Sequence, residues 1–223
     1  IGENTCAVII EPIQGESGIL PATQEYLQAA RRLCDEHGAL LILDEVQTGM
    51  GHTGKLFTYE HYGITPDILS SAKALGGGFP IGAILTTDKI APTFGPGTHG
   101  STFGGNPMAC AVGSRAFDII NAPETLAHVE KQGKKFQTTL RELGEKTGVF
   151  KEVRGMGLLI GCVLADQYKG RASEITAAAL KHGLMVLVAG ADVVRFAPSL
   201  LLNDEDMAEG LKRLEAALTE WIA

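Results

Sequence analysis

Residues 6–45 read CAVIIEPIQGESGILPATQEYLQAARRLCDEHGALLILDE, which is two short apolar runs on either side of an amphipathic stretch. The runs at 6–10 and 39–43 are typical of strands buried on both faces of a parallel sheet. Between them, Thr23 suits a helix N-cap and Gly38 a helix stop, so the spacing predicts a helix through about His37. Strand, helix and strand with short connections predict a right-handed βαβ crossover, and hence an α/β fold.

Two further apolar runs follow, at 67–72 and 81–87. The link between them, KALGGGFP, is too short to hold a crossover helix, so we expect the fourth strand to run antiparallel to the third. The first strand begins close to the start of the chain, although its composition suits the centre of a sheet. We therefore expect that the sheet lacks its first strands and that the chain is the back half of a longer protein.

The second half of the chain has a different pattern of apolar and charged residues. A helix between Asn106 and Asn121, with Pro107 in its first turn, is expected to bridge the two regions. Beyond it the pattern predicts helices at 123–147, 172–182 and from 203 onwards, and strands near 150–164, 184–188 and 193–197. We accordingly divide the chain into 1–121, the C-terminal part of a large domain with its linking helix, and 122–223, a small α+β domain.

Composition excludes several classes of protein. A chain of 223 residues that is 45% hydrophobic and 20% charged is neither disordered nor collagen-like. A net charge of −7 argues against nucleic acid or an anionic membrane as a partner, and the absence of a long apolar run or signal peptide predicts a cytoplasmic protein. The cysteines are far apart and lack metal-ligand spacing, so we expect free thiols and no metal site: Cys6, Cys34, Cys110 and Cys162.

Lys73 is the only charged residue between Asp67 and Asp88, in a neutral and glycine-rich stretch. A lone ammonium in such a stretch either extends to solvent or serves as a nucleophile in a site that lowers its pKa. Asp44 directly follows an apolar run, where open α/β sheets bind their ligands, but aspartate at such a position is also a common turn cap. The residue types alone leave both questions open.

Arg195 is the only charged residue between Asp192 and Asp204, inside the apolar run VVRFAPSLLL. A guanidinium there needs a carboxylate, either from the protein, with Glu16 as the candidate, or from a substrate. A second pattern, GMGHTG at 49–54, satisfies the dinucleotide fingerprint GxGxxG but begins six residues after its strand. It leaves a nicotinamide-dependent reductase as a distant alternative.

Four motifs occur in order along the chain: EPIQGESG (11–18), LLILDEVQTGMGHTG (40–54), SSAKALGGGFPIGA (70–83) and GTHGSTFGGNP (97–107). In order and spacing they resemble the class III aminotransferases that use pyridoxal 5'-phosphate (PLP). Within that family the chain is most similar to the acetylornithine and succinylornithine aminotransferases, a likeness that continues through 153–161 and 193–200. The resemblance implies a fold-type-I PLP-dependent transferase: the later strands of a mostly parallel sheet in a large PLP-binding domain, followed by a small C-terminal domain.

The same resemblance implies roles for individual residues. Lys73 would hold PLP as a Schiff base and, once substrate displaces it, move the proton between substrate carbon and cofactor. Asp44 would keep the pyridine nitrogen protonated, which makes the ring an electron sink. Val46 would pack on the face of the ring, and Gln47 would contact its phenolic oxygen.

Other implied contacts involve a second subunit and the substrates. Thr102, with Ser101 beside it, would reach the phosphate of the neighbouring subunit's cofactor, which implies a homodimer with shared active sites. As in the related ornithine aminotransferases, Glu16 would mask Arg195 while the amine donor reacts and would release it when 2-oxoglutarate enters. His52 departs from the family, which usually has arginine there.

The activity implied is transfer of the side-chain amino group of N2-acetyl- or N2-succinyl-L-ornithine to 2-oxoglutarate, a step of arginine metabolism. Members of the family are nearly twice as long, and their first half supplies the main phosphate-binding turn, an aromatic residue that stacks on the cofactor and the arginine that holds the substrate α-carboxylate. Two alternatives remain. One is another class III ω-aminotransferase, acting on ornithine, 4-aminobutyrate or succinyl-diaminopimelate; the other is an inactive fragment that serves as a folding or dimerising unit.

Overall fold

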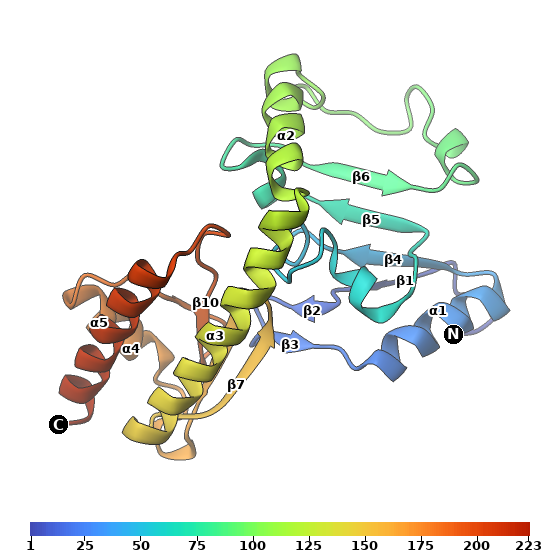
Figure 1. Cartoon of the computed structure of the whole chain (residues 1–223). Helices are drawn as coiled ribbons and strands as arrows, with labels where there is room; N and C mark the ends of the chain where they lie inside the picture. The colour runs from blue at the N-terminus through green and yellow to red at the C-terminus, as the bar shows by residue number, and fades with distance from the viewer. The chain divides into compact units, whose positions relative to one another are not determined.

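The computed structural model describes residues 1–223, which form two compact units (Figure 1). The first comprises Ile1–Pro12, Ala22–Gly51 and Lys55–Pro123, and the second comprises Ile13–Pro21, His52–Gly54 and Glu124–Ala223. Two short segments from the first half of the sequence therefore belong to the second unit. The assignment of residues 1–121 to a large domain and 122–223 to a small one stays a prediction.

The first unit is built on a four-stranded sheet in the order β1-β4-β5-β6. Its strands are β1 (Ala7–Ile10), β4 (Leu40–Asp44), β5 (Ile68–Ser71) and β6 (Ala83–Thr86). The first three strands are parallel, whereas β6 runs antiparallel to β5, as Figure 1 shows and as the short link predicted. The link holds only a short 3-10 helix, η2 (Lys73–Gly76), which confirms that it has no room for a crossover.

Helix α1 (Gln24–His37) makes the predicted crossover from β1 to β4. The Thr23 hydroxyl accepts a hydrogen bond from the Tyr26 amide at 3.2 Å, and Gly38 ends the helix in the left-handed conformation with φ 67°. The remaining helices of this unit are η1 (Thr58–Tyr62), η3 (Ala91–Thr93) and α2 (Pro107–Ile120). Asn106 caps α2, so the predicted start of that helix is confirmed.

Strand β1 differs from its prediction. It lies at the edge of the four-stranded sheet, and the side chain of Ile9 is 70% exposed, so β1 is not buried on both faces in this chain. None of the 223 residues pairs with its outer edge, and none covers the face from which Ile9 projects. The aliphatic composition of β1 is therefore typical of a strand that is more deeply buried than β1 is within these 223 residues.

The second unit contains an antiparallel sheet in the order β7-β8-β10-β9. Its elements are α3 (Pro123–Thr147), β7 (Phe150–Met156), β8 (Leu159–Leu164), η4 (Asp166–Tyr168), α4 (Ala172–Lys181), β9 (Leu187–Val188), β10 (Val193–Phe196) and α5 (Asp204–Ile222). The three α-helices contribute to one core with the sheet, whose fully buried members include Leu140, Ile160, Ile175 and Val194. This arrangement makes one face of the sheet a continuous apolar layer.

The opposite face of this sheet carries a small hairpin formed by β2 (Ile13–Gln14) and β3 (Leu20–Pro21). Ile13 and Ile19 of the hairpin segment are fully buried against Leu159, Val163 and Val193. Residues 13–18 of the EPIQGESG motif thereby belong to the second unit, although they lie near the start of the sequence.

The four cysteines are free thiols, as the sequence predicted. Cys6 and Cys110 are exposed, whereas Cys34 and Cys162 are buried, and burial raises the pKa of both buried thiols. Across the whole chain, every helix is too short or too polar to cross a lipid bilayer.

Candidate functional site

Lys73 lies two residues after the end of strand β5 and has an unusual backbone. Its φ is 47°, in the left-handed region that a residue with a Cβ adopts only at a cost of about 1–2 kcal/mol. Its exposed side chain donates a hydrogen bond from Nζ to Oε1 of Gln47. Backbone strain of this kind is characteristic of functional positions, because the surrounding structure must maintain it.

Asp44 ends strand β4 and lies opposite Ser70 of β5 in the register of the sheet. Since the two strands are parallel, their carboxyl ends meet at one edge, where open α/β sheets bind ligands. The half-buried Asp44 accepts two hydrogen bonds on Oδ1, from the Val46 amide at 3.0 Å and the Ser70 hydroxyl at 3.1 Å, and none on Oδ2. One carboxylate oxygen is therefore fixed, and the other remains open to a donor.

The structure thus brings four of the predicted site residues together. Val46 and Gln47 belong to the turn that follows Asp44, and Gln47 links that turn to Lys73. A primary amine, an amide and an open carboxylate oxygen lie at the same edge of the sheet. This is a suitable arrangement for a small ligand with a carbonyl carbon and a protonated nitrogen.

Glu45 was not among the predicted site residues, yet it organises this turn. Its side chain is 1% exposed and accepts hydrogen bonds from the amides of Thr58 and Tyr59, at 2.6 and 2.8 Å, and from the Thr48 hydroxyl at 3.1 Å. Burial raises the pKa of this carboxyl group, while the hydrogen bonds act in the opposite direction. Its main chain also bonds to Ser70 and Gly49, which closes the turn.

A signal for Glu45 was present in the sequence. Leu41 and Leu43 point to the buried face of β4, and Glu45 continues the same two-residue alternation. A carboxylate on the buried face at the end of a strand must find donors, and two of its three donors come from a segment 13 and 14 residues further along the chain.

Ser101 and Thr102 are not part of the Lys73 cluster. Both are exposed, and neither forms a hydrogen bond with Lys73, Asp44 or Gln47. The Ser101 hydroxyl instead accepts a hydrogen bond from the Gly104 amide at 2.9 Å within its own loop. Their predicted contact with the cofactor phosphate of a neighbouring subunit stays a prediction.

Glu16 and Arg195 form an ion pair within the second unit. Arg195 lies on β10 and is 9% exposed; its Nη1 donates to Oε1 of Glu16 at 2.5 Å and to the Gly15 carbonyl at 3.1 Å. Its Nε is buried and has no hydrogen-bond partner. The two residues that sequence reasoning paired are therefore in contact, and the Nε edge of the guanidinium remains available to a further acceptor.

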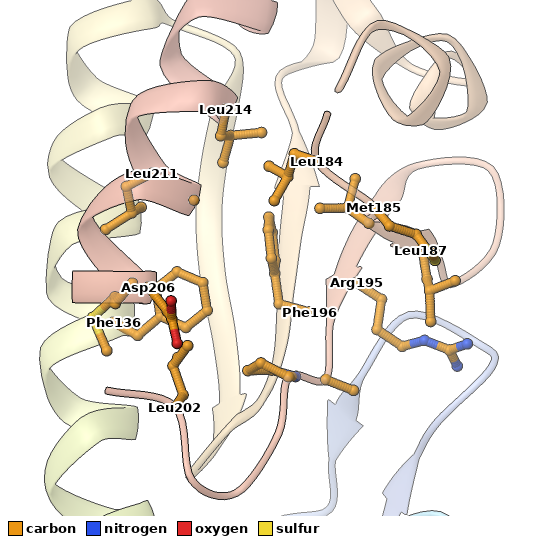
Figure 2. Close-up of a pocket in the computed structure, with 15 residues that line it drawn as sticks. Phe136, Leu184, Met185, Leu187, Arg195, Phe196, Leu202, Asp206, Leu211 and Leu214 are labelled. Carbon is orange, nitrogen blue, oxygen red and sulfur yellow. The ribbon is translucent and has the colours of Figure 1, made fainter. Parts of the chain in front are cut away.

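An apolar cavity of about 250 Å³ lies beside Arg195 in the same unit. Figure 2 shows its walls, which include Phe136, Leu184, Phe196 and Leu211, with Asp206 at one side. The Arg195 guanidinium points away from the ring of Phe196 and towards the hairpin segment that contains Glu16. The guanidinium of Arg195 therefore does not point into this cavity.

The GMGHTG pattern does not form a dinucleotide site. Residues 49–54 lie in consecutive turns, and the next helix is the 3-10 helix η1, five residues long. The dinucleotide fingerprint requires a glycine turn that leads directly into an α-helix, whose N-terminus binds the pyrophosphate. The nicotinamide-dependent reductase is therefore the wrong interpretation.

Comparison with known proteins agrees with this geometry. Residues 1–218 match the family described as Aminotransferase class-III. Acetylornithine aminotransferase of Neisseria meningitidis serogroup B is 81% identical over 223 residues, which is 100% of this chain and 56% of the relative. A Pseudomonas aeruginosa protein named succinylornithine transaminase/acetylornithine aminotransferase is 57% identical over 222 residues, 100% of this chain and 55% of the relative.

A solved structure is also similar to this chain. The crystal structure of N-acetylornithine aminotransferase from Stenotrophomonas maltophilia K279a superposes with a TM-score of 0.90 at 47% identity, covering 97% of this chain and 57% of that one. The chain thus spans about half the length of the relatives that it matches. Its fold is that of the fold-type-I transferases, as predicted, and the chain belongs to the aminotransferase class-III family.

Proposed function

We propose that the protein at its full natural length is a PLP-dependent aminotransferase that transfers the side-chain amino group of an N2-acylated ornithine to 2-oxoglutarate. The observation that carries the proposal is the Lys73 ammonium bonded to Gln47 at the sheet edge where Asp44 presents an open carboxylate oxygen. The names of the relatives at 81% and 57% identity support an acetyl or succinyl group on the substrate.

The residues present fit PLP. The open Oδ2 of Asp44 is an acceptor for a protonated ring nitrogen, and the Lys73 side chain offers a primary amine for the aldehyde. Val46 would pack on the face of the ring, and Gln47 would contact its phenolic oxygen. When bound, PLP supplies a ring that takes up the electron pair released at the substrate carbon.

The chain's own residues perform the other tasks. The amine of Lys73 is the nucleophile and the group that holds or releases a proton at Nζ. Asp44 keeps a fixed orientation, since Val46 and Ser70 both donate to its Oδ1, so its charge stays directed at one point. Gln47 holds the Lys73 ammonium in place through its amide oxygen.

We further propose that residues 1–121 belong to a large PLP-binding domain and 122–223 to a small domain. In a homodimer the exposed loop of Ser101 and Thr102 would reach the phosphate of the neighbouring subunit's cofactor. Exposure of both hydroxyl side chains in the isolated chain supports this placement, because a phosphate needs accessible donors.

Borohydride labelling tests the cofactor assignment. With PLP added to the protein at its full natural length, we expect a yellow solution that borohydride bleaches, and mass spectrometry should find the PLP adduct on Lys73. The same protein should aminate 2-oxoglutarate faster with N2-acetyl- or N2-succinylornithine than with ornithine or 4-aminobutyrate. A label on a different lysine would contradict the site, and a preference for free ornithine would contradict the substrate.

Replacement of Glu16 with glutamine tests the ion pair. Loss of the charged partner should loosen the mask on Arg195 and change the balance between donor and acceptor half-reactions by about tenfold, the value of one charge-assisted hydrogen bond. Single-turnover measurements of each half-reaction give this ratio. Ser17→Ala, at the exposed neighbouring position, is the control and should leave the ratio unchanged. Equal losses in both half-reactions of Glu16→Gln would rule out the masking role.

A further inference from the structure

The loop that carries Glu16 is held at both ends by arginines of one sheet. Arg195 of β10 donates from Nη1 to the Gly15 carbonyl at 3.1 Å, in addition to its bond with Glu16. Arg154 of β7 donates from Nε and Nη2 to the Gly18 carbonyl, at 2.9 and 2.8 Å. The exposed side chain of Glu16 thus lies between two anchored carbonyl groups.

The sheet register places these two arginines in one row. Gly161 of the intervening strand β8 lies opposite Arg154 on one side and opposite Arg195 on the other. Directly opposed residues of antiparallel strands point to the same face, so both arginines project towards the hairpin. A Cβ added at Gly161 would lie 2.9 Å from the Cβ of Ile19. The missing side chain therefore makes room for the loop between the two guanidinium groups.

The backbone of the loop matches this arrangement. Gly18 has φ 114°, a conformation that residues with a side chain rarely adopt, and a Cβ there would lie 2.8 Å from Nη2 of Arg154. Ile19, with φ 51°, follows it and is fully buried. The backbone conformations of Gly18 and Ile19 orient the Gly18 carbonyl towards Arg154. The planar guanidinium of Arg154 can then donate two hydrogen bonds to it.

We propose that Arg154 is a positioning residue for the Glu16–Arg195 pair. By fixing the Gly18 carbonyl, Arg154 holds the loop so that the Glu16 carboxylate lies at Nη1 of Arg195. This rests on the proposed function, in which Glu16 masks Arg195. Arg154 then governs how readily a dicarboxylate reaches Arg195, although the Nε and Nη2 donors of Arg154 are bonded to the protein backbone.

The sign of the effect distinguishes positioning from simple attraction. Arg154 is itself a cation, so if it acted only through its charge, its removal would weaken the binding of a dianion. If Arg154 positions Glu16, removal of Arg154 weakens the contact between Glu16 and Arg195, and 2-oxoglutarate should bind more tightly. Arg154→Lys keeps the charge but loses the two-donor fork, so it should shift affinity in the same direction as Arg154→Met and by less.

The experiment measures the dissociation constant of 2-oxoglutarate by titration calorimetry on the PLP-free protein at its full natural length, together with the KM values for donor and acceptor in the holoenzyme. We expect about tenfold tighter 2-oxoglutarate binding in Arg154→Met and about threefold in Arg154→Lys, with a higher KM for the amine donor in both. In a Glu16→Gln background, Arg154→Met should add no further change.

Glu152→Gln is the matched control, because Glu152 contacts Arg154 at 3.4 Å without touching the loop carbonyls, and it should leave the dissociation constant unchanged. Weaker binding in Arg154→Met, or a full additional effect on top of Glu16→Gln, would overturn the proposal. If Glu16→Gln itself changes nothing, the masking function fails, whatever Arg154 does. If Arg154→Met does not fold, the direction in which Arg154→Lys changes the dissociation constant of 2-oxoglutarate decides the proposal: a lower constant supports it and a higher one overturns it.

Discussion

Replacing Lys73 with alanine is expected to reduce transamination by at least about 10³-fold at the protein's full natural length. In the proposed function one amine serves both as the nucleophile and as the proton-transfer group, and proton transfer alone contributes about 10²- to 10⁴-fold. Steady-state rates with N2-acetylornithine and 2-oxoglutarate give the loss. Borohydride should no longer attach PLP to the protein.

Two further variants separate the amine from its charge. Lys73→Arg keeps a cation beside Gln47 but offers no nucleophilic amine, so it should lose as much activity as Lys73→Ala. Lys89→Ala removes an exposed lysine from the same unit and should leave the rate unchanged. A Lys73→Ala variant that retained more than a tenth of the activity would be incompatible with the assigned role.

Replacing Gly133 with alanine is expected to lower the free energy of unfolding by about 3 kcal/mol. Gly133 lies inside α3, and a Cβ there would come within 2.6 Å of the Cα of Gly157, in the turn between β7 and β8. Glycine to alanine within a helix normally stabilises by about 1 kcal/mol, so the expected sign is reversed. The backbone of Gly157 cannot move aside as a flexible side chain would. The midpoint of thermal unfolding should fall by roughly 10 °C.

Gly210→Ala is the matched control for this prediction. Gly210 also lies inside a helix, α5, but its added Cβ would meet only the Leu184 side chain, at an ordinary 3.7 Å. This variant should unfold at the same temperature as the parent or slightly above it. If both substitutions proved equally harmless, the close approach of α3 to the β7–β8 turn would be incorrect.

Much of the architecture was predictable because its causes are local. Thr23, Asn106 and Asn203 each cap the helix that the pattern placed after them, since a short polar side chain satisfies an otherwise unpaired amide within three residues. The short link after β5 excluded a crossover for a similar reason, because chain length limits which direction the next strand takes.

The candidate site was predictable in part. Lys73 and Asp44 stood out because each breaks an apolar pattern, and the structure places both at one edge of the sheet. The burial of Glu45 followed from strand alternation, but its partners Thr58 and Tyr59 did not, because they are supplied by the folding of a later turn. The expected burial of β1 on both faces was wrong, because composition indicates the burial that suits a strand and not which segments of the chain cover it.

The sequence by itself determined the α-helices, the strands of the two four-stranded sheets, the βαβ crossover, the antiparallel fourth strand and the motifs that mark the family, but not the hairpin of β2 and β3. Periodicity, capping and linker length are short-range properties, because each depends only on residues that are close together in the sequence. Only the tertiary structure decided that Arg154, Gly161 and Arg195 form one row beneath the Glu16 loop. That row depends on the pairing register of three strands with a hairpin from the other end of the chain, and register is set by side-chain packing across the sheet.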